Sequence, residues 1–167
     1  INVTIDGTDY RIREPHPFST QWYGHKFNGA GVRYEIGIHI ESGWIVWVNG
    51  PYPYGLWPDL AVAKNLLHLC LRPNEQYIAD DTYRCPEALL PEDACNLDEY
   101  EYMDVARARH EQVNRLFKIF KVLSNVFKRE VTKHGVFMHA VIVQLGLMTG
   151  EMNVFDVHER APLPEGW

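Results

Sequence analysis

Hydrophobic and polar residues alternate in three runs along the first third of the chain. The runs cover residues 1–5, 32–40 and 44–48. Such alternation is typical of strands with one buried face. We therefore expect the second and third runs to form a hairpin and the first to complete a three-stranded meander. Residues 49–55, rich in glycine and proline, are predicted to be an irregular connection.

Asp6-Gly7 directly follows the first predicted strand. In one interpretation Asp6 lies at the carboxyl end of the strand, where a sheet commonly offers a ligand crevice. In the other, Asp-Gly is only a hairpin turn. The local pattern leaves both interpretations open.

Helical segments follow from residue 59 onward. Asp59 precedes the helix formers of residues 60–67, as an N-cap or a first-turn acid. The strongest pattern predicts a helix from about 104 to 128, and a short apolar helix is expected over 136–148, with His139 packed in the core. The apolar stripe of the long helix consists of Val113, Leu116, Phe120, Leu123 and Phe127.

A short strand and a loop are predicted between these helices. Residues 76–79 form the strand, which ends at Asp80 and Asp81. A helix between two strands with acidic ends suggests a crossover that brings those ends side by side. Residues 84–104 have no clear period and are predicted to be a long loop.

Composition limits the class of protein. The chain has 167 residues, 46% of them hydrophobic, which suits one domain with a sizeable core. We expect this domain to span residues 1–149 and to be followed by a tail of residues 150–167. No continuous run of 18 apolar residues occurs, so no membrane span is expected. The first residue is Ile rather than Met and no leader precedes it, so we expect a piece of a longer product, and the three cysteines are expected to be reduced thiols of an intracellular protein.

The charge is unevenly distributed. The net charge is −6, yet residues 74–104 contain ten acids and one base, whereas residues 107–133 contain eight bases and two acids. At about 100° per residue, Arg107, Arg115 and Lys118 fall on the same side of the long helix as Glu111. This face is either a solvated set of salt bridges or a carboxylate site bordered by phosphate contacts.

The order of elements is typical of an α/β ribonuclease H-like fold, with a mixed five-stranded sheet flanked by helices. In this fold, clustered carboxylates bind divalent metal ions. Two such ions, held about 3.5 to 4 Å apart, can activate water and stabilise the leaving oxygen of a phosphodiester. Carboxylates crowded together need a hard cation such as Mg²⁺ to offset their repulsion.

Four blocks and a loop of the sequence resemble the DDE superfamily endonucleases, the catalytic domains of Harbinger-type transposases and their bacterial relatives. The resemblance extends over residues 1–149. Arg107, Glu111 and Lys118 reproduce the spacing of the signature around the catalytic glutamate, although Asp104 replaces its tyrosine and Thr82 replaces a usual glycine. The blocks are Ile5-Asp6-Gly7-Thr8, Gly55-Leu56-Trp57-Pro58-Asp59, Ala79-Asp80-Asp81-Thr82-Tyr83 and Arg107-Ala108-Arg109-His110-Glu111, and the loop is Trp22-Tyr23-Gly24-His25-Lys26-Phe27-Asn28-Gly29.

The resemblance implies the site residues. Asp6 and Glu111 are expected to be catalytic metal ligands for two Mg²⁺ or Mn²⁺ ions. The middle acid is Asp59 by the family blocks or Asp80 by fold logic, and both can serve. The bases expected to contact DNA are Lys26, Arg107, Arg115 and Lys118.

The implied activity is metal-dependent DNA cleavage and strand transfer at element ends and target DNA. The expected partners are DNA, a separate DNA-binding protein and further copies of the chain, with no membrane. The expected location is the nucleus in a eukaryote and otherwise the cell interior. The alternative is a domesticated, inactive domain that docks DNA or protein.

Overall fold

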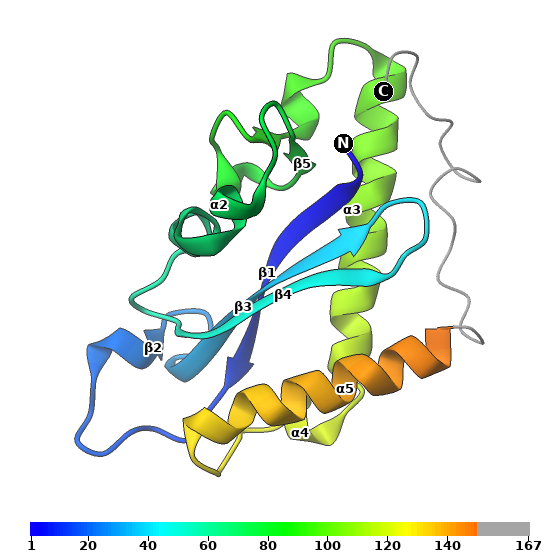
Figure 1. Ribbon diagram of the computed structural model, residues 1–167. Helices are drawn as coiled ribbons and strands as arrows, with labels where there is room; N and C mark the ends of the chain where they lie inside the picture. The colour runs from blue at the N-terminus through cyan, green and yellow to red at the C-terminus, as the bar shows by residue number, and fades with distance from the viewer. Residues whose placement is uncertain (150–167) are drawn as a thin grey trace.

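The computed structural model describes residues 1–149, and the predicted tail of residues 150–167 lies outside that range. A mixed sheet forms the centre of the molecule (Figure 1). Its main strands lie in the order β4-β3-β1-β5-β6, antiparallel from β4 to β1 and parallel from β1 to β6. A sixth strand, β2, also pairs with β3. The strands are β1 (Val3–Arg11), β2 (Tyr23–Gly24), β3 (Gly29–His39), β4 (Ile45–Pro53), β5 (Tyr77–Ile78) and β6 (Ala88–Leu89).

This order confirms the predicted α/β fold with a mixed sheet, and it is consistent with a ribonuclease H-like fold. The meander of β1, β3 and β4 is confirmed, and so is the crossover that sets β5 parallel to β1. The strand boundaries need correction. β1 continues through Asp6 and Gly7 to Arg11, so Asp6 lies inside a strand and Asp6-Gly7 is not a turn. β4 continues to Pro53, because an edge strand tolerates proline.

The helices are α1 (Asp59–Val62), α2 (His68–Cys70), α3 (Leu97–Phe117), α4 (Lys121–Ser124) and α5 (His134–Thr149). A π-helical turn, η2 (Ala63–Leu67), connects α1 to α2. The predicted helix 104–128 is wrong at both ends. α3 begins within the predicted loop, where the side chain of Asn96 accepts a hydrogen bond from the Glu99 N–H at 2.9 Å, and β6 also lies in that loop.

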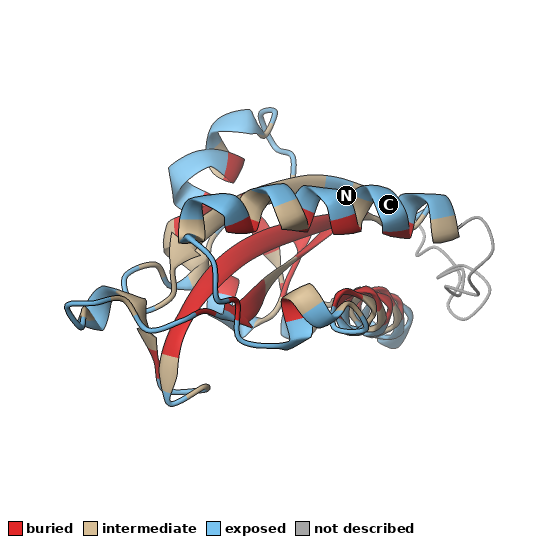
Figure 2. Ribbon diagram, turned by 90° about the horizontal axis from the view of Figure 1, so that it is seen from below, coloured by how far each residue is buried: buried red, intermediate tan, exposed pale blue. Residues whose placement is uncertain are grey.

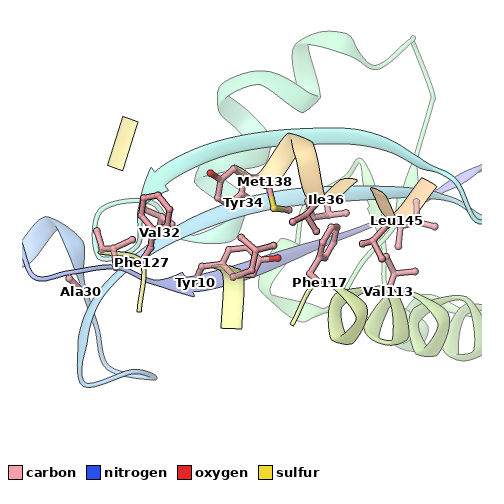
Figure 3. Close-up of a cluster of buried hydrophobic side chains, with 14 residues drawn as sticks. Tyr10, Ala30, Val32, Tyr34, Ile36, Val113, Phe117, Phe127, Met138 and Leu145 are labelled. Atoms are coloured by element: carbon pink, nitrogen blue, oxygen red, sulfur yellow. The ribbon is translucent and has the colours of Figure 1, made fainter. Parts of the chain in front are cut away.

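Two helical layers cover the sheet. Side chains alternate between its faces, and β3 is buried along nearly its whole length (Figure 2). On one face, Val113 and Phe117 of α3 and Met138 and Leu145 of α5 pack against even-numbered residues of β1 and β3 (Figure 3). On the other face, the helix from α1 to α2 packs against Ile5 and Tyr77.

The buried histidines differ from the predicted one. His139 is exposed, and its Nδ1 lies 2.8 Å from the carbonyl oxygen of Gly135. His110 and His134 are buried instead, and burial lowers their pKa values to about 3 and about 4. Both are therefore neutral near pH 7 and serve as hydrogen-bonding core residues, His110 with Thr4 and His134 with Tyr34.

α5 leaves an apolar face outward. Val136, Val143 and Leu147 are exposed, while the opposite side of the helix packs in the core. The window Val131–Met148 has the length and composition of a membrane-crossing helix, with 22% of it buried. The window contains polar residues such as Lys133 and is not a continuous apolar run, so the expectation of no membrane span stays a prediction. Met138, Val141 and Leu145 of α5 are buried in the core against the sheet.

Candidate active site

Asp6 is the centre of the candidate site because its strand has a free edge there. β5 is short and pairs with β1 only at Thr4 and Ile78. Among the described residues, the edge of β1 on that side therefore pairs with no other segment until the single bridge between Ile12 and Phe127. The Asp6 side chain lies on the α3 face, where the amide nitrogen of Asn114 donates a hydrogen bond to its carboxylate at 2.8 Å. Desolvation, with the nearby charges of Asp80 and Asp59, raises the pKa of Asp6 to about 7.

Asp80 and Glu111 reach the same place from different elements. Asp80 follows β5 and caps the short turn η3 (Asp81–Tyr83), where its side chain accepts a hydrogen bond from the Thr82 N–H at 3.1 Å. Glu111 projects from α3 and is exposed. Both line one cavity of about 60 Å³ with Asp6. We call it the acid cavity, and its lining is Thr4, Ile5, Asp6, Asp80, Arg107, His110 and Glu111.

A second hollow joins this cavity to basic side chains. A groove of about 210 Å³ is lined by Asp6 and Glu111 together with Lys26, Arg115 and Lys118. Glu111 and Arg115 are 3.5 Å apart, the distance of an exposed i,i+4 ion pair. Three of the predicted acids, Asp6, Asp80 and Glu111, therefore lie next to the predicted bases. Arg107 borders the acid cavity, and the other three bases border the groove.

Asp59 lies on the opposite face of the sheet from Asp6. It is in the first turn of α1, as one of the two predicted roles had it, and its carboxylate is 3.1 Å from the Arg33 guanidinium. A Cβ at Gly7 would lie 2.0 Å from an Asp59 oxygen, so Asp59 packs on the Gly7 face of β1, whereas Asp6 faces α3. The sheet backbone thus separates Asp59 from the cavity that Asp6, Asp80 and Glu111 line.

The sequence did not predict the ion pairs that Arg33 of β3 forms with Asp59 and Asp9. Two nitrogens of the Arg33 guanidinium donate hydrogen bonds to the Asp9 carboxylate of β1, at 2.8 and 3.2 Å. Lys26 is 3.8 Å from the same carboxylate. Glu35, two residues along β3, is fully buried; its carboxylate accepts a hydrogen bond from the Trp47 indole at 2.8 Å. Burial raises the pKa of Glu35 to about 7. The sequence signal for these buried charges was the presence of Arg33 and Glu35 within the otherwise largely apolar run of residues 32–40.

Gly7→Ala tests how tightly Asp59 is held against β1. The new methyl group would overlap the Asp59 carboxylate, which cannot move without weakening its pair with Arg33. We expect a loss of about 1–3 kcal/mol in the free energy of unfolding, measured by urea denaturation. Gly29→Ala is the matched control, because its methyl group would meet only one backbone oxygen at 3.9 Å. Equal stabilities of the two variants would contradict the close approach.

The acid cavity offers hard oxygen donors of the kind that Mg²⁺ and Mn²⁺ prefer. The pKa of Asp6 is raised chiefly by desolvation and next by repulsion from the neighbouring carboxylates, and a cation would relieve that repulsion. The carboxylates of Asp6, Asp80 and Glu111 line the same cavity, but their oxygen atoms are not grouped within 4.8 Å of one another. Among residues 1–149, the one group of three His, Cys, Asp or Glu ligand atoms within 4.8 Å of one another is His68, Cys85 and Glu87.

A model of a known protein family matches most of the chain. A family model described as DDE superfamily endonuclease matches residues 5–146. Neither the curated proteins nor the solved structures contain a significant match to the chain. The matched range includes all four candidate acids and all four candidate bases.

Proposed function

Because this chain belongs to the DDE superfamily endonucleases, we propose that it is a divalent-metal-dependent transposase catalytic domain that cleaves DNA and transfers the freed strand. One observation carries the proposal beyond family membership. Asp6 and Glu111 border both the acid cavity and the groove lined by Lys26, Arg115 and Lys118. Acids at the junction with a basic groove suit a phosphodiester substrate, whose charge the bases offset while the acids hold cations.

Asp6, Asp80 and Glu111 are the residues that would hold the metal ions. Bound there, Mg²⁺ or Mn²⁺ would supply an activated water and stabilise the leaving oxygen of the phosphodiester. Asn114 would keep the Asp6 carboxylate oriented through its hydrogen bond. Asp59 would act from the opposite face, by fixing Gly7 and β1 through its pair with Arg33.

The bases would bind DNA without reading its sequence. Lys26, Arg115 and Lys118 would contact backbone phosphates along the groove, and Arg107 would contact one at the cavity. Such contacts position the substrate and make binding sensitive to salt. Element-end recognition would then come from a separate DNA-binding protein or segment, and the protein would act in the nucleus of a eukaryote or otherwise inside the cell.

A second candidate function is a domesticated domain that no longer cleaves DNA and instead docks DNA or protein. The observation that favours it is the apolar outer face of α5, where Val136, Val143 and Leu147 are exposed. Exposed apolar patches commonly mark protein contacts. The same face would also serve an active enzyme that assembles with copies of itself.

Cleavage of supercoiled plasmid DNA in Mn²⁺ tests the proposed function. We expect the parent chain to nick the plasmid and Asp80→Asn to lose activity by more than about 100-fold. This exceeds the loss typical of changing a residue that only supports a metal ligand. Asp59→Asn should lose less activity, because its side chain is outside the cavity. Circular dichroism controls for folding. A folded parent that binds DNA without nicking it in Mn²⁺ would favour the docking domain, and an equal loss in both variants would contradict the assignment of Asp80 over Asp59.

A further inference from the structure

His68, Cys85 and Glu87 form a second cluster of metal-ligating side chains, distinct from the acid cavity. One ligand atom from each residue lies within 4.8 Å of the others, and all three side chains are half-buried. The Cys85 sulfur is 3.9 Å from His68 Nε2, and a Glu87 oxygen is 3.9 Å from His68 Nδ1. The Tyr77 hydroxyl is 3.6 Å from the Cys85 sulfur and 2.9 Å from His68 Nε2.

Two segments of the chain build this cluster, the start of α2 and the connection between η3 and β6. His68 begins α2 immediately after the π-helical turn η2, and the extra residue in such a turn rotates the following side chains relative to a continuous α-helix. Cys85 follows η3, and Glu87 immediately precedes β6. His68 and Cys85 are 17 residues apart, and no compact zinc-binding motif links them.

The chemistry of the cluster suits a borderline-soft cation. Zn²⁺ binds thiolate at about 2.3 Å and imidazole nitrogen at about 2.0–2.1 Å, which at a tetrahedral angle separates sulfur from nitrogen by about 3.6 Å. The observed 3.9 Å between the Cys85 sulfur and His68 Nε2 is close to this separation. A thiolate disfavours Mg²⁺, so the cluster and the acid cavity call for different metals.

We propose that Cys85, His68 and Glu87 bind one Zn²⁺-class cation. His68 would bind the ion through Nε2, the ring nitrogen that faces the Cys85 sulfur, and the Tyr77 hydroxyl would give up its contact with that nitrogen. The Glu87 carboxylate, which lies beside Nδ1, would turn toward the ion. The Cys85 thiol releases its proton to solvent on binding, and the Tyr77 hydroxyl lies within reach to donate a hydrogen bond to the resulting thiolate. His68 and Glu87 also line a pocket of about 580 Å³, which leaves room for water as a fourth ligand.

The bound ion would fasten the segment after Asp80 to the helix that begins at Asp59. Cys85 and Glu87 lie between η3 and β6, and His68 lies at the other end of the helix from Asp59. Zinc would therefore stabilise the loop that leads away from the candidate catalytic acid. This inference does not depend on nuclease activity, and its test can fail or succeed independently of that activity.

Titration of the metal-free chain with Co²⁺, a spectroscopic substitute for Zn²⁺, tests the site. We expect one equivalent of Co²⁺ to produce a thiolate-to-cobalt absorption band that Zn²⁺ abolishes, and Zn²⁺ to raise the melting temperature. Cys85→Ser should remove both effects, and His68→Asn should weaken Co²⁺ binding by more than about 10-fold. Cys70→Ser and Cys95→Ser are matched controls, because both thiols are exposed and outside the cluster.

Asp6→Asn should leave the band unchanged, because carboxylates produce no thiolate band. His68→Asn keeps all three cysteines, so it remains informative if Cys85→Ser does not fold. A folded parent with no thiolate band would overturn the proposal. A band that survives in both Cys85→Ser and His68→Asn would overturn it as well.

Discussion

Asp6→Asn is expected to abolish Mn²⁺-dependent cleavage while making the metal-free protein more stable above pH 7. The pKa of the Asp6 carboxyl is about 7 in the folded chain and 3.8 in the reference state, chiefly because of desolvation and next because of Asp80 and Asp59. A raised carboxyl pKa means that the unfolded state releases this proton first. Stability from the group is thus fully present below pH 3.8 and is lost as the pH rises to about 7.

The size of the gain follows from the same shift. About three pKa units correspond to at most about 4 kcal/mol, and partial solvent screening reduces this, so we expect Asp6→Asn to gain about 1–3 kcal/mol at pH 8. The new amide can still accept the hydrogen bond from Asn114. Urea unfolding at pH 5 and pH 8 in EDTA measures the effect, and the difference between the variants should grow with pH.

Glu101→Gln is the matched control for this experiment, because Glu101 is exposed on α3 and outside the acid cavity. It should change neither cleavage nor the pH dependence of unfolding. Mn²⁺ binding to the parent should strengthen as the pH rises through about 7, since the Asp6 proton must leave before the carboxylate can bind the ion. A loss of stability in Asp6→Asn at pH 8 would instead indicate that the carboxylate is a structural group.

The sequence predicted the fold where hydrophobic period and burial agree. The meander follows from alternating apolar residues, and α5 follows from its apolar composition. The crossover follows from the helix between two strands that were predicted to have acidic ends. β1 was predicted too short because Asp6-Gly7 looks like the end of a strand or a turn. In the structure Asp9 is buried by its pair with Arg33 of β3, and no local pattern reveals that distant partner. The start of α3 was missed because the acids of its first turn resemble a solvated loop.

The candidate site was predictable to a similar extent. The helical period correctly set Glu111 beside Arg115, and the crossover brought Asp80 to Asp6. The hydrophobic pattern of the sequence could not show whether Asp59 or Asp80 lies beside Asp6, because the answer depends on which face of β1 each acid approaches. The cluster of His68 and Cys85 also escaped the sequence, because a π-helical turn and two loops bring the side chains together.

Arg33→Met is expected to cost about 3–5 kcal/mol in the free energy of unfolding. The guanidinium of Arg33 contacts both Asp9 and Asp59, and all three side chains are largely withdrawn from water. Methionine of similar length would fill part of the space and leave two neighbouring carboxylates without their counter-charge. Removing one partner of a buried ion pair is costly because the remaining charge has lost its solvation as well as its partner.

Lys26→Met is the matched control, since Lys26 also approaches Asp9 but is exposed. It should cost less than about 1 kcal/mol in urea unfolding. Adding Asp9→Asn to Arg33→Met removes one orphaned charge and should recover part of the lost stability. Arg33→Met should also slow DNA cleavage, because it releases Asp59 from its place beside Gly7, whereas Lys26→Met should act mainly on DNA binding at low salt. Equal stabilities of Arg33→Met and Lys26→Met would show that Arg33 does not hold β1, β3 and α1 together.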